Sequence, residues 1–276
     1  MRICVLAQSS VDSAFMKIYK PSLRVLLVTV LIMIILGSSV LIVMFLSPRP
    51  LAGVKVAVYD DNGTTPASQI ALESMFRWMG ADVTVIGDED VETGALSSYD
   101  VFVAPGGCWC DERCDILDDY EIVRQFVLDG GTYFGIDGGA SYATSYRLGL
   151  FQGMLWADTN GTGDWLLEMN VNRESTGPDL SDEPESYTIF YESSGHFDAE
   201  NMTGIIPICT YTDTGLPSMI AFKYGNGTVF LSSPHPEYEE GNMNDGTDLW
   251  DTYSDPDSEW GFMLKICEWL LEESNP

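Results

Sequence analysis

Positive charge is scarce in this sequence. Its 276 residues include 13 Lys and Arg against 42 Asp and Glu, which gives a formal net charge of −29. Five of the 13 basic residues but only one acid precede Leu51, so the remaining eight basic and 41 acidic residues give the rest of the chain a charge of −33. Proteins bind nucleic-acid backbones and anionic lipid surfaces through Lys and Arg. The shortage therefore excludes a nucleic-acid partner and an anionic membrane surface as a ligand, and is typical of a solvated acidic surface.

Charge of either sign is absent between Val25 and Leu46. A membrane-spanning helix needs roughly 20 apolar residues, and this run of 22 is long enough. A signal-peptide core has only about 7–15 residues and precedes a small-residue cleavage site, whereas this run is followed by the sequence Ser-Pro-Arg-Pro. We therefore expect a transmembrane signal anchor over residues 25–46.

Basic residues flank this run unequally. Four of them precede it and only Arg49 follows it before Leu51. By the positive-inside rule, the chain is expected to be a single-pass protein of the cell membrane, with its N-terminus in the cytoplasm and its main domain outside the cell. The predicted organisation is a cytoplasmic tail over 1–24, the anchor over 25–46, a linker over 47–53 and an exported domain over 54–276. Four Asn-X-Thr sequons agree with export; they begin at Asn62, Asn160, Asn201 and Asn226.

The exported part alternates apolar strand-like runs with helical patterns. Strands are predicted over 54–60, 81–86, 99–107 and 132–137, with helices over 67–79 and 119–129. The first helix is expected to place Ile70, Met75, Trp78 and Met79 on or near one face. This alternation predicts an α/β fold with a mostly parallel, flavodoxin-like sheet flanked by helices. The second half predicts β-hairpins, with strands over 186–191, 204–212, 218–224 and 227–233, and then a closing helix over 258–272.

Three loops follow the carboxyl ends of predicted strands. They are Pro105-Gly106-Gly107, the turn at Asp137 and residues 232–237. Ligands of open parallel sheets bind at that edge, so these loops predict one shared site. The segment Gly135-Ile136-Asp137-Gly138-Gly139 has the spacing of a nucleophile elbow, a sharp strand-to-helix turn that normally presents Ser or Cys.

Five segments, taken in order, resemble the class I glutamine amidotransferase-like superfamily, and within it the biotin-protein-ligase N-terminal-type domain. These segments are VAVYDDNG, VFVAPGG, GGTYFGIDGGASYA, IFYESSGHF and GNGTVFLSSPHPE. The resemblance covers roughly residues 53–237 and implies an amidotransferase-like fold.

The resemblance also implies roles for site residues. His235 and Glu237 match the base and the orienting acid of a Cys-His-Glu triad, and Gly106 and Gly107 match the loop that offers backbone N–H groups to an oxyanion. Gly138 and His196 border the same cleft. Asp137 stands where active relatives carry Cys.

Asp137 changes the chemistry expected of this site. In such a triad, amide hydrolysis needs a thiolate to attack the amide carbon and an imidazole to take and return the proton. A carboxylate would have to expel a poor leaving group and form an anhydride more reactive than the amide. Oxyanion stabilisation of about 3–4 kcal/mol per donor does not rescue that step. If His235 lies within hydrogen-bond reach of Asp137, we expect the two to form an ion pair. Asp137 and Glu237 together should then raise the pKa of His235 above about 6.5.

Three cysteines follow the glycine loop, at Cys108, Cys110 and Cys114. Outside the cell a disulfide is the default, most simply with Cys114 as one partner. A metal site formed by these thiolates and His235 is a second interpretation, although the two-pair spacing of a zinc knuckle is missing. A displaced nucleophile, Cys108 acting with His235, is the third. Two further cysteines, Cys209 and Cys267, are expected to be buried small hydrophobic residues.

Two remaining features are predicted to be structural. A plain loop histidine is favoured for His196 over a ligand contact. The tract 238–259 has many acids and no basic residue; it lacks EF-hand spacing and is expected to be a solvated loop that covers part of the cleft.

Two function classes follow. In the first, the protein is a membrane-attached binding module, inactive as an amidase, whose cleft takes a small polar ligand or a peptide segment. In the second, it is a hydrolase that uses Cys108 or Asp137 with His235. No cofactor is expected and a metal is left open. Biotin-ligase activity is not supported, because no basic phosphate-binding loop is present.

Overall fold

The computed structural model describes residues 32, 50–108, 120–199, 202–255 and 257–274. The chain divides into two compact units, Met1–Pro48 and Arg49–Pro276, and the second is described below. The anchor predicted over 25–46 lies outside the described residues, apart from Ile32. Within the ranges that are described, none of the helices has the length and apolarity needed to cross a membrane.

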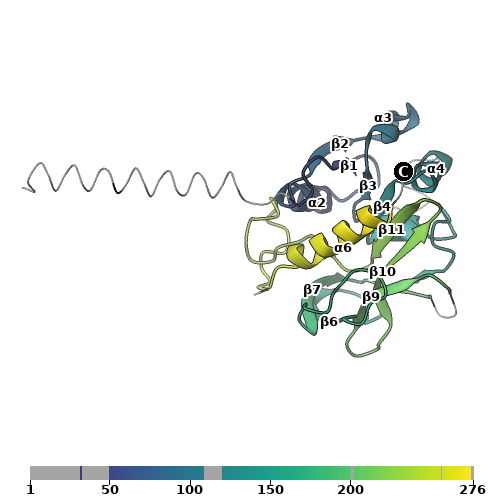
Figure 1. Ribbon diagram of the computed structural model, residues 1–276. Coiled ribbons are helices and arrows are strands. Elements are labelled where there is room, and N and C mark those ends of the chain that lie inside the picture. Colours follow the sequence, from purple (N-terminus) through teal and green to yellow (C-terminus); the bar gives the residue numbers. More distant parts are fainter. Residues whose placement is uncertain (1–31, 33–49, 109–119, 200–201, 256, 275–276) are drawn as a thin grey trace, which may run out of the picture. The chain divides into compact units, whose positions relative to one another are not determined.

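One nine-stranded sheet forms the centre of the domain (Figure 1). Its strand order is β2-β1-β3-β4-β11-β10-β9-β6-β7. The first five strands are parallel, namely β2 (Asp82–Ile86), β1 (Lys55–Tyr59), β3 (Val101–Ala104), β4 (Thr132–Ile136) and β11 (Gly227–Ser232). The other four continue the sheet antiparallel, namely β10 (Pro217–Tyr224), β9 (Ile206–Tyr211), β6 (Asp164–Val171) and β7 (Ser186–Glu192). A separate pair is formed by β5 (Leu155–Trp156) and β8 (His196–Phe197).

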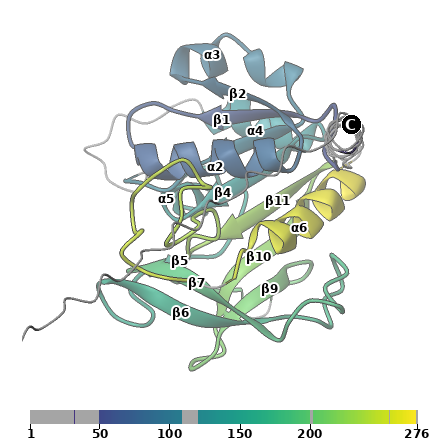
Figure 2. The same cartoon turned by 90° about the vertical axis from the view of Figure 1, so that its left-hand side faces the viewer.

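Helices cover both faces of the parallel part. Helix α2 (Pro66–Trp78) and helix α6 (Trp260–Glu273) lie on one face (Figure 2). Helix α4 (Tyr120–Leu128) and the short α5 (Gly138–Tyr142) pack on the other. The small helices α3 (Asp88–Glu92) and η1 (Ala95–Ser98) follow β2. This is a mixed α/β fold with a large sheet, as the sequence predicts.

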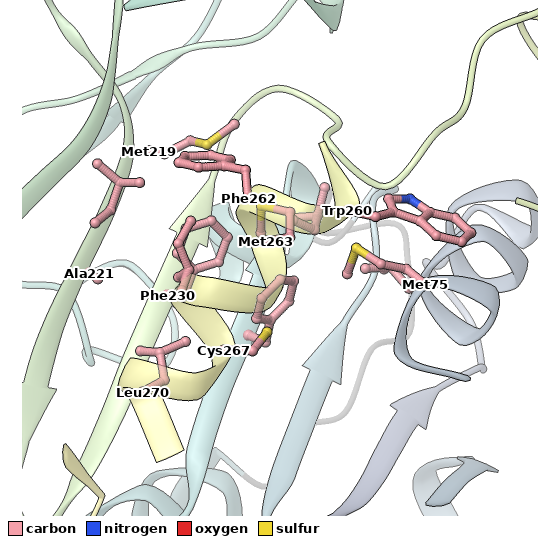
Figure 3. Close-up of a cluster of buried hydrophobic side chains, with 14 of the residues drawn as sticks. Met75, Met219, Ala221, Phe230, Trp260, Phe262, Met263, Cys267 and Leu270 are labelled. Atoms are coloured by element: carbon pink, nitrogen blue, oxygen red, sulfur yellow. The ribbon is translucent and has the colours of Figure 1, made fainter. Parts of the chain in front are cut away.

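Helix α6 closes the core because its apolar residues recur on one face. Met263, Cys267 and Leu270 are almost fully buried and pack toward the sheet residue Phe230 and toward Met75 of α2 (Figure 3). Cys209 on β9 belongs to the same core and is fully buried. Both cysteines are free thiols, so their prediction as small hydrophobic residues is confirmed.

Helix α2 departs from the predicted face. Met75 and Met79 are buried, but Ile70 and Trp78, predicted to lie with them, are 37% and 55% exposed. The buried stripe instead includes Leu72 and Phe76. The Trp78 ring packs edge-to-face with the Trp260 ring, with 5.7 Å between the two ring centroids.

Candidate functional site

Asp137 lies at the turn between β4 and α5, in a backbone conformation that non-glycine residues rarely adopt (φ 46°, ψ −109°). Its backbone N–H donates to the Ser232 carbonyl at 2.8 Å, and its own carbonyl accepts from Ser141 at 2.9 Å. A Cβ on Gly139 would lie 2.1 Å from the carbonyl oxygen of Ala104. The glycine after the turn is therefore required so that the elbow can pack directly against the end of β3.

The carboxyl group of Asp137 faces the glycine loop that follows β3. Its Oδ2 accepts a hydrogen bond from the Gly107 N–H at 3.0 Å, and the Gly138 N–H also donates to this carboxyl. Burial raises the pKa of Asp137, although His235 and the two N–H groups act to lower it. The acid thus occupies the N–H of Gly107, which belongs to the loop predicted to offer backbone donors to an oxyanion.

The loop that carries Gly107 is fixed by the segment before α2. Thr65 donates to the Gly106 carbonyl at 2.8 Å, and Cys108 donates to the Gly63 carbonyl at 2.8 Å. Gly107 has φ 146°, and a Cβ there would lie 2.0 Å from the Gly63 carbonyl oxygen. Only glycine fits this close approach, so the position of the N–H that binds Asp137 is built into the backbone.

His235 and Glu237 follow β11, the neighbour of β4. The Nδ1 of His235 lies 3.0 Å from Oε1 of Glu237. The buried hydroxyl of Ser68, on α2, donates to the same oxygen at 2.7 Å and accepts from the Gly106 N–H at 2.9 Å. A chain of hydrogen bonds therefore joins the glycine loop to the imidazole through Ser68 and Glu237.

The other ring nitrogen of His235 faces a second acid. Nε2 lies 3.8 Å from Oε2 of Glu192, a half-exposed residue at the end of β7, and makes no hydrogen bond to any described residue. Burial lowers the pKa of His235, but Glu237, Asp137 and Glu192 outweigh burial and raise it to about 9. The imidazole is therefore protonated at neutral pH, and a protonated imidazole cannot serve as a general base.

The ion pair predicted for Asp137 and His235 within hydrogen-bond reach is not among the ion pairs of the described residues, whereas the predicted rise in the pKa of His235 is found. The ion-pair contacts of His235 are with Glu237 and Glu192, and Asp137 acts on the imidazole only through its charge. The reason is that Asp137 turns its carboxyl toward the Gly107 and Gly138 N–H groups. Sequence reasoning missed Ser68 and Glu192, which come from α2 and β7; Glu192 lies within the segment IFYESSGHF, whose resemblance to the family was the available signal.

Cys108 is disulfide-bonded. A cysteine in that state carries no free thiolate, so the alternative in which Cys108 is a nucleophile for His235 is not supported. Cys110 and Cys114 lie outside the described residues. Within the described part of the chain, no three or more His, Cys, Asp or Glu side chains are arranged to hold a metal ion.

His196 lies on β8, away from these contacts. Its Nδ1 lies 2.8 Å from the hydroxyl of Thr159, and burial lowers its pKa. The neighbouring Gly195 N–H donates to the Ser233 hydroxyl at 2.6 Å, two residues before His235. The β8 segment is thus tied to the site, while the His196 side chain bonds to a loop threonine.

The acidic tract after Glu237 does cover the site, but it is not simply solvated. Tyr238 stacks on the His235 ring with 5.3 Å between the ring centroids, and Trp250 stacks on Phe190 with 4.5 Å between the ring centroids. Five acids from this region are less than 9% exposed: Glu237, Glu239, Glu240, Asp245 and Glu259. The expected solvated loop is therefore corrected to a cover with buried carboxylates.

A cavity of about 960 Å³ lies at the other end of the parallel strands. Its lining includes Val54, Tyr99 and Gly131, residues that precede β1, β3 and β4. None of Asp137, His235 and Glu237 lines it. The candidate site is therefore a compact cluster at the carboxyl edge, separate from this cavity.

Solved structures share this fold. A glutamine amidotransferase from Thermotoga maritima matches with a TM-score of 0.54 and 14% identity, over 79% of this chain and 96% of that one. A cytoplasmic protein of Salmonella typhimurium, STM1381, matches with a TM-score of 0.50 and 12% identity, over 80% and 100%. No protein-family model matches the chain, and no curated protein does. At these identities the likeness concerns the fold alone, an α/β fold that this chain shares with the Thermotoga glutamine amidotransferase.

Proposed function

We propose that this protein is a membrane-anchored, extracytoplasmic binding module on an amidotransferase-like fold, inactive as an amidase. One observation carries the proposal: the Asp137 carboxylate itself accepts the hydrogen bond of the Gly107 N–H at 3.0 Å. An amide substrate would need that donor for its developing oxyanion, and losing one such donor costs about 3–4 kcal/mol of transition-state stabilisation.

The state of His235 supports the same conclusion. With a pKa of about 9 it holds its proton at neutral pH, so it cannot take a proton from a nucleophile. Asp137 is also a poor nucleophile toward an amide, because the product would be an anhydride. The site thus keeps the arrangement of a triad, but a protonated His235 and an Asp137 in place of the nucleophile favour ligand binding over hydrolysis.

The ligand proposed for this site is a small polar molecule or a peptide segment. Glu192 is half-exposed and stands beside the buried imidazole, so it offers a carboxylate at the surface of the site. N–H groups of a ligand would satisfy such an acceptor. The membrane attachment rests on the apolar run 25–46 and on the excess of basic residues before it.

The test is to replace Asp137 with Cys and measure hydrolysis of glutamine and of simple amides and esters. We expect no hydrolysis by the wild type, because the nucleophile is missing and the donors are occupied. Asp137→Cys frees the Gly107 N–H and supplies a thiol beside His235. It also removes one of the acids that raise the pKa of His235, so hydrolysis should appear.

Two matched variants complete this test. Asp137→Asn keeps the shape without a nucleophile and should stay inactive. Asp137→Cys combined with His235→Gln should lose whatever activity the single variant gains. Hydrolysis by the wild type that Asp137→Asn abolishes would contradict the proposal and support the alternative, a hydrolase in which Asp137 attacks with His235.

A further inference from the structure

The cavity of about 960 Å³ at the amino ends of the parallel strands has no part in the Asp137 site. Its lining comes from the segments that precede β1, β3 and β4, from one side of α4 and from the end of α6. Pockets that bind small molecules have volumes of about 300–1,000 Å³. The domain therefore has a second space, at the opposite edge of the sheet from Asp137, that is large enough for an organic ligand.

Part of the cavity wall is apolar and belongs to the core. Leu96 is buried, and the partly buried side chains of Ile122 and Phe126 pack against the same core cluster. The Phe126 ring lies so close to Gly131 that a Cβ there would be 2.3 Å from a ring carbon. A wall that is fixed by core packing keeps its shape without a ligand, and its apolar surface favours an apolar group over water.

The charged groups of the lining are all acids. Asp100, Glu121 and Asp129 line the cavity, and no Lys or Arg is among the described residues that do so. Glu121 is paired with Arg124 at 3.2 Å. Asp100 and Asp129 form no ion pair with any residue that the structure describes. Two carboxylates at the apolar wall therefore lack an opposite charge.

Two helices also end at this cavity. Asp129 directly follows α4, while Leu271 and Ser274 line the cavity from the end of α6. Neither helix has a basic residue in its last turn, and Lys223, which pairs with Glu273, is not part of the lining. The C-terminus of a helix carries a partial negative charge that favours cations. Both helix ends therefore add to the negative potential of the two unpaired acids.

We propose that this cavity binds a small organic amine, with its apolar body against Leu96, Ile122 and Phe126 and its ammonium group beside Asp100 and Asp129. An anionic ligand would meet only carboxylates and helix C-termini, which repel it. A bare metal ion would gain nothing from the apolar wall, and a neutral apolar ligand would gain nothing from the acids. A ligand that is apolar at one end and cationic at the other matches both parts of the lining.

The experiment titrates the full chain, held in phosphatidylcholine nanodiscs at neutral pH, with dansylcadaverine. This probe joins a primary ammonium to a dansyl ring whose emission rises and shifts to the blue in apolar surroundings. Two controls keep the ring and change the charge: N-acetyl-dansylcadaverine is neutral, and dansyl-aminocaproate is anionic. After subtraction of the emission from empty nanodiscs, we expect saturable binding of the amine, about tenfold weaker binding of the neutral probe and weakest binding of the anion. Added salt should weaken binding of the amine most.

Matched variants assign the binding to this cavity. Asp100→Asn and Asp129→Asn should each weaken binding of the amine by about three- to fivefold, because each removes one charge, and should leave binding of the neutral probe unchanged. Ser97 lines the cavity and is exposed, so Ser97→Trp should obstruct the space and weaken binding of both probes. The control is Asp198→Asn, an exposed acid beyond β8 that is not part of the lining; it should bind like the wild type.

Absence of saturable amine binding would overturn the proposal, and so would equal affinity for the amine and its acetylated form. Binding that Ser97→Trp leaves intact, or that Asp100→Asn and Asp129→Asn together leave intact, would also overturn it, because the amine would then bind elsewhere. Asp137→Cys should bind the amine like the wild type. This readout does not depend on hydrolysis, so its failure is separate from failure of the Asp137 proposal.

Discussion

His235 is enclosed by Glu237, Glu192 and Asp137, and its protonation controls what the site can do. Burial alone would lower its pKa, as burial does for His196. The three acids reverse that effect and raise the pKa to about 9. The same histidine with fewer acids around it would be a usable base near neutral pH.

Replacing Glu237 with Gln should therefore lower the pKa of His235 markedly, toward neutrality, because the strongest of the three acidic influences is removed while burial remains. NMR titration of the ring protons measures this directly. The chain has only two histidines, so His196 serves as an internal control whose pKa should not move. A His235 pKa that stays near 9 would show that Glu237 is not its main partner.

The sequence could place Asp137, His235 and Glu237 at neighbouring strand ends because each follows an apolar strand run. It could not place Ser68 or Glu192. Ser68 contacts Glu237 although 169 residues separate them in the sequence. Glu192 lies near His235 because β7 ends beside the segment that follows β11, where the backbone N–H of His235 donates to the Phe190 carbonyl at 3.0 Å. Such contacts depend on tertiary packing, which leaves no local pattern.

The turn from β4 to α5 is the element that holds the site in shape. It packs so tightly on β3 that a Cβ at Gly139 would clash with the Ala104 backbone at 2.1 Å. A Cβ at Gly261, in the first turn of α6, would meet nothing within 4 Å. The two glycines therefore serve different needs although both lie near helix starts.

Gly139→Ala should destabilise the domain by about 2–3 kcal/mol or more, since the backbone must move to relieve the clash. Gly261→Ala should instead stabilise it, by up to about 1 kcal/mol, because alanine favours the helix. Urea unfolding of the two variants and the wild type measures both effects. Similar changes in the two variants would contradict the close packing of the elbow.

Periodicity predicted most elements of the parallel half, because β1, β3 and β4 are largely buried, mostly apolar runs. It missed β6, whose eight residues include exposed and half-buried positions, with only Met169 and Val171 buried. It also misplaced one edge of α2, because Ile70 and Trp78 flank the stripe that the sheet covers. Amphipathic spacing predicts which side of a helix faces the core, but the width of the buried stripe depends on the elements packed against the helix.

At the scale of the whole molecule, the raised pKa values of Glu240 and His235 act on stability in the same direction. Burial raises the pKa of Glu240 from 4.5 to about 8, so the folded protein binds a proton that the unfolded chain has released. The pKa of His235 is raised from 6.5 to about 9, so its contribution to stability is complete below pH 6.5 and is lost as the pH rises through 9.

The free energy of unfolding should therefore fall as the pH rises from about 5 to 9. Each group that stays protonated only in the folded protein should contribute a slope of about 1.4 kcal/mol per pH unit. Urea unfolding at a series of pH values measures this slope. Glu240→Gln should flatten the part between about pH 5 and 8. Stability that rises through this window would contradict the buried state of these groups.

The topology of the chain also belongs to this scale. Protease added to intact cells should digest the acidic domain, while an epitope placed in residues 1–24 should survive, because the basic residues before the apolar run keep that end inside. Permeabilised cells provide the control in which both parts are digested. Protection of the domain in intact cells would overturn the proposed orientation.

The pairing of β4 with β11 has a consequence for the order in which the chain is made. The hydroxyls of Thr132 and Thr228 meet at 2.9 Å across 96 residues of sequence. During synthesis, β1 to β4 and the Asp137 turn emerge long before β11, so β4 has an open edge until nearly the whole domain has left the ribosome. Closing so long a loop is slow, and an open strand edge invites pairing with other chains. A newly made chain would thus depend on prompt arrival of its last quarter, and the imidazole would join the elbow only at that final step.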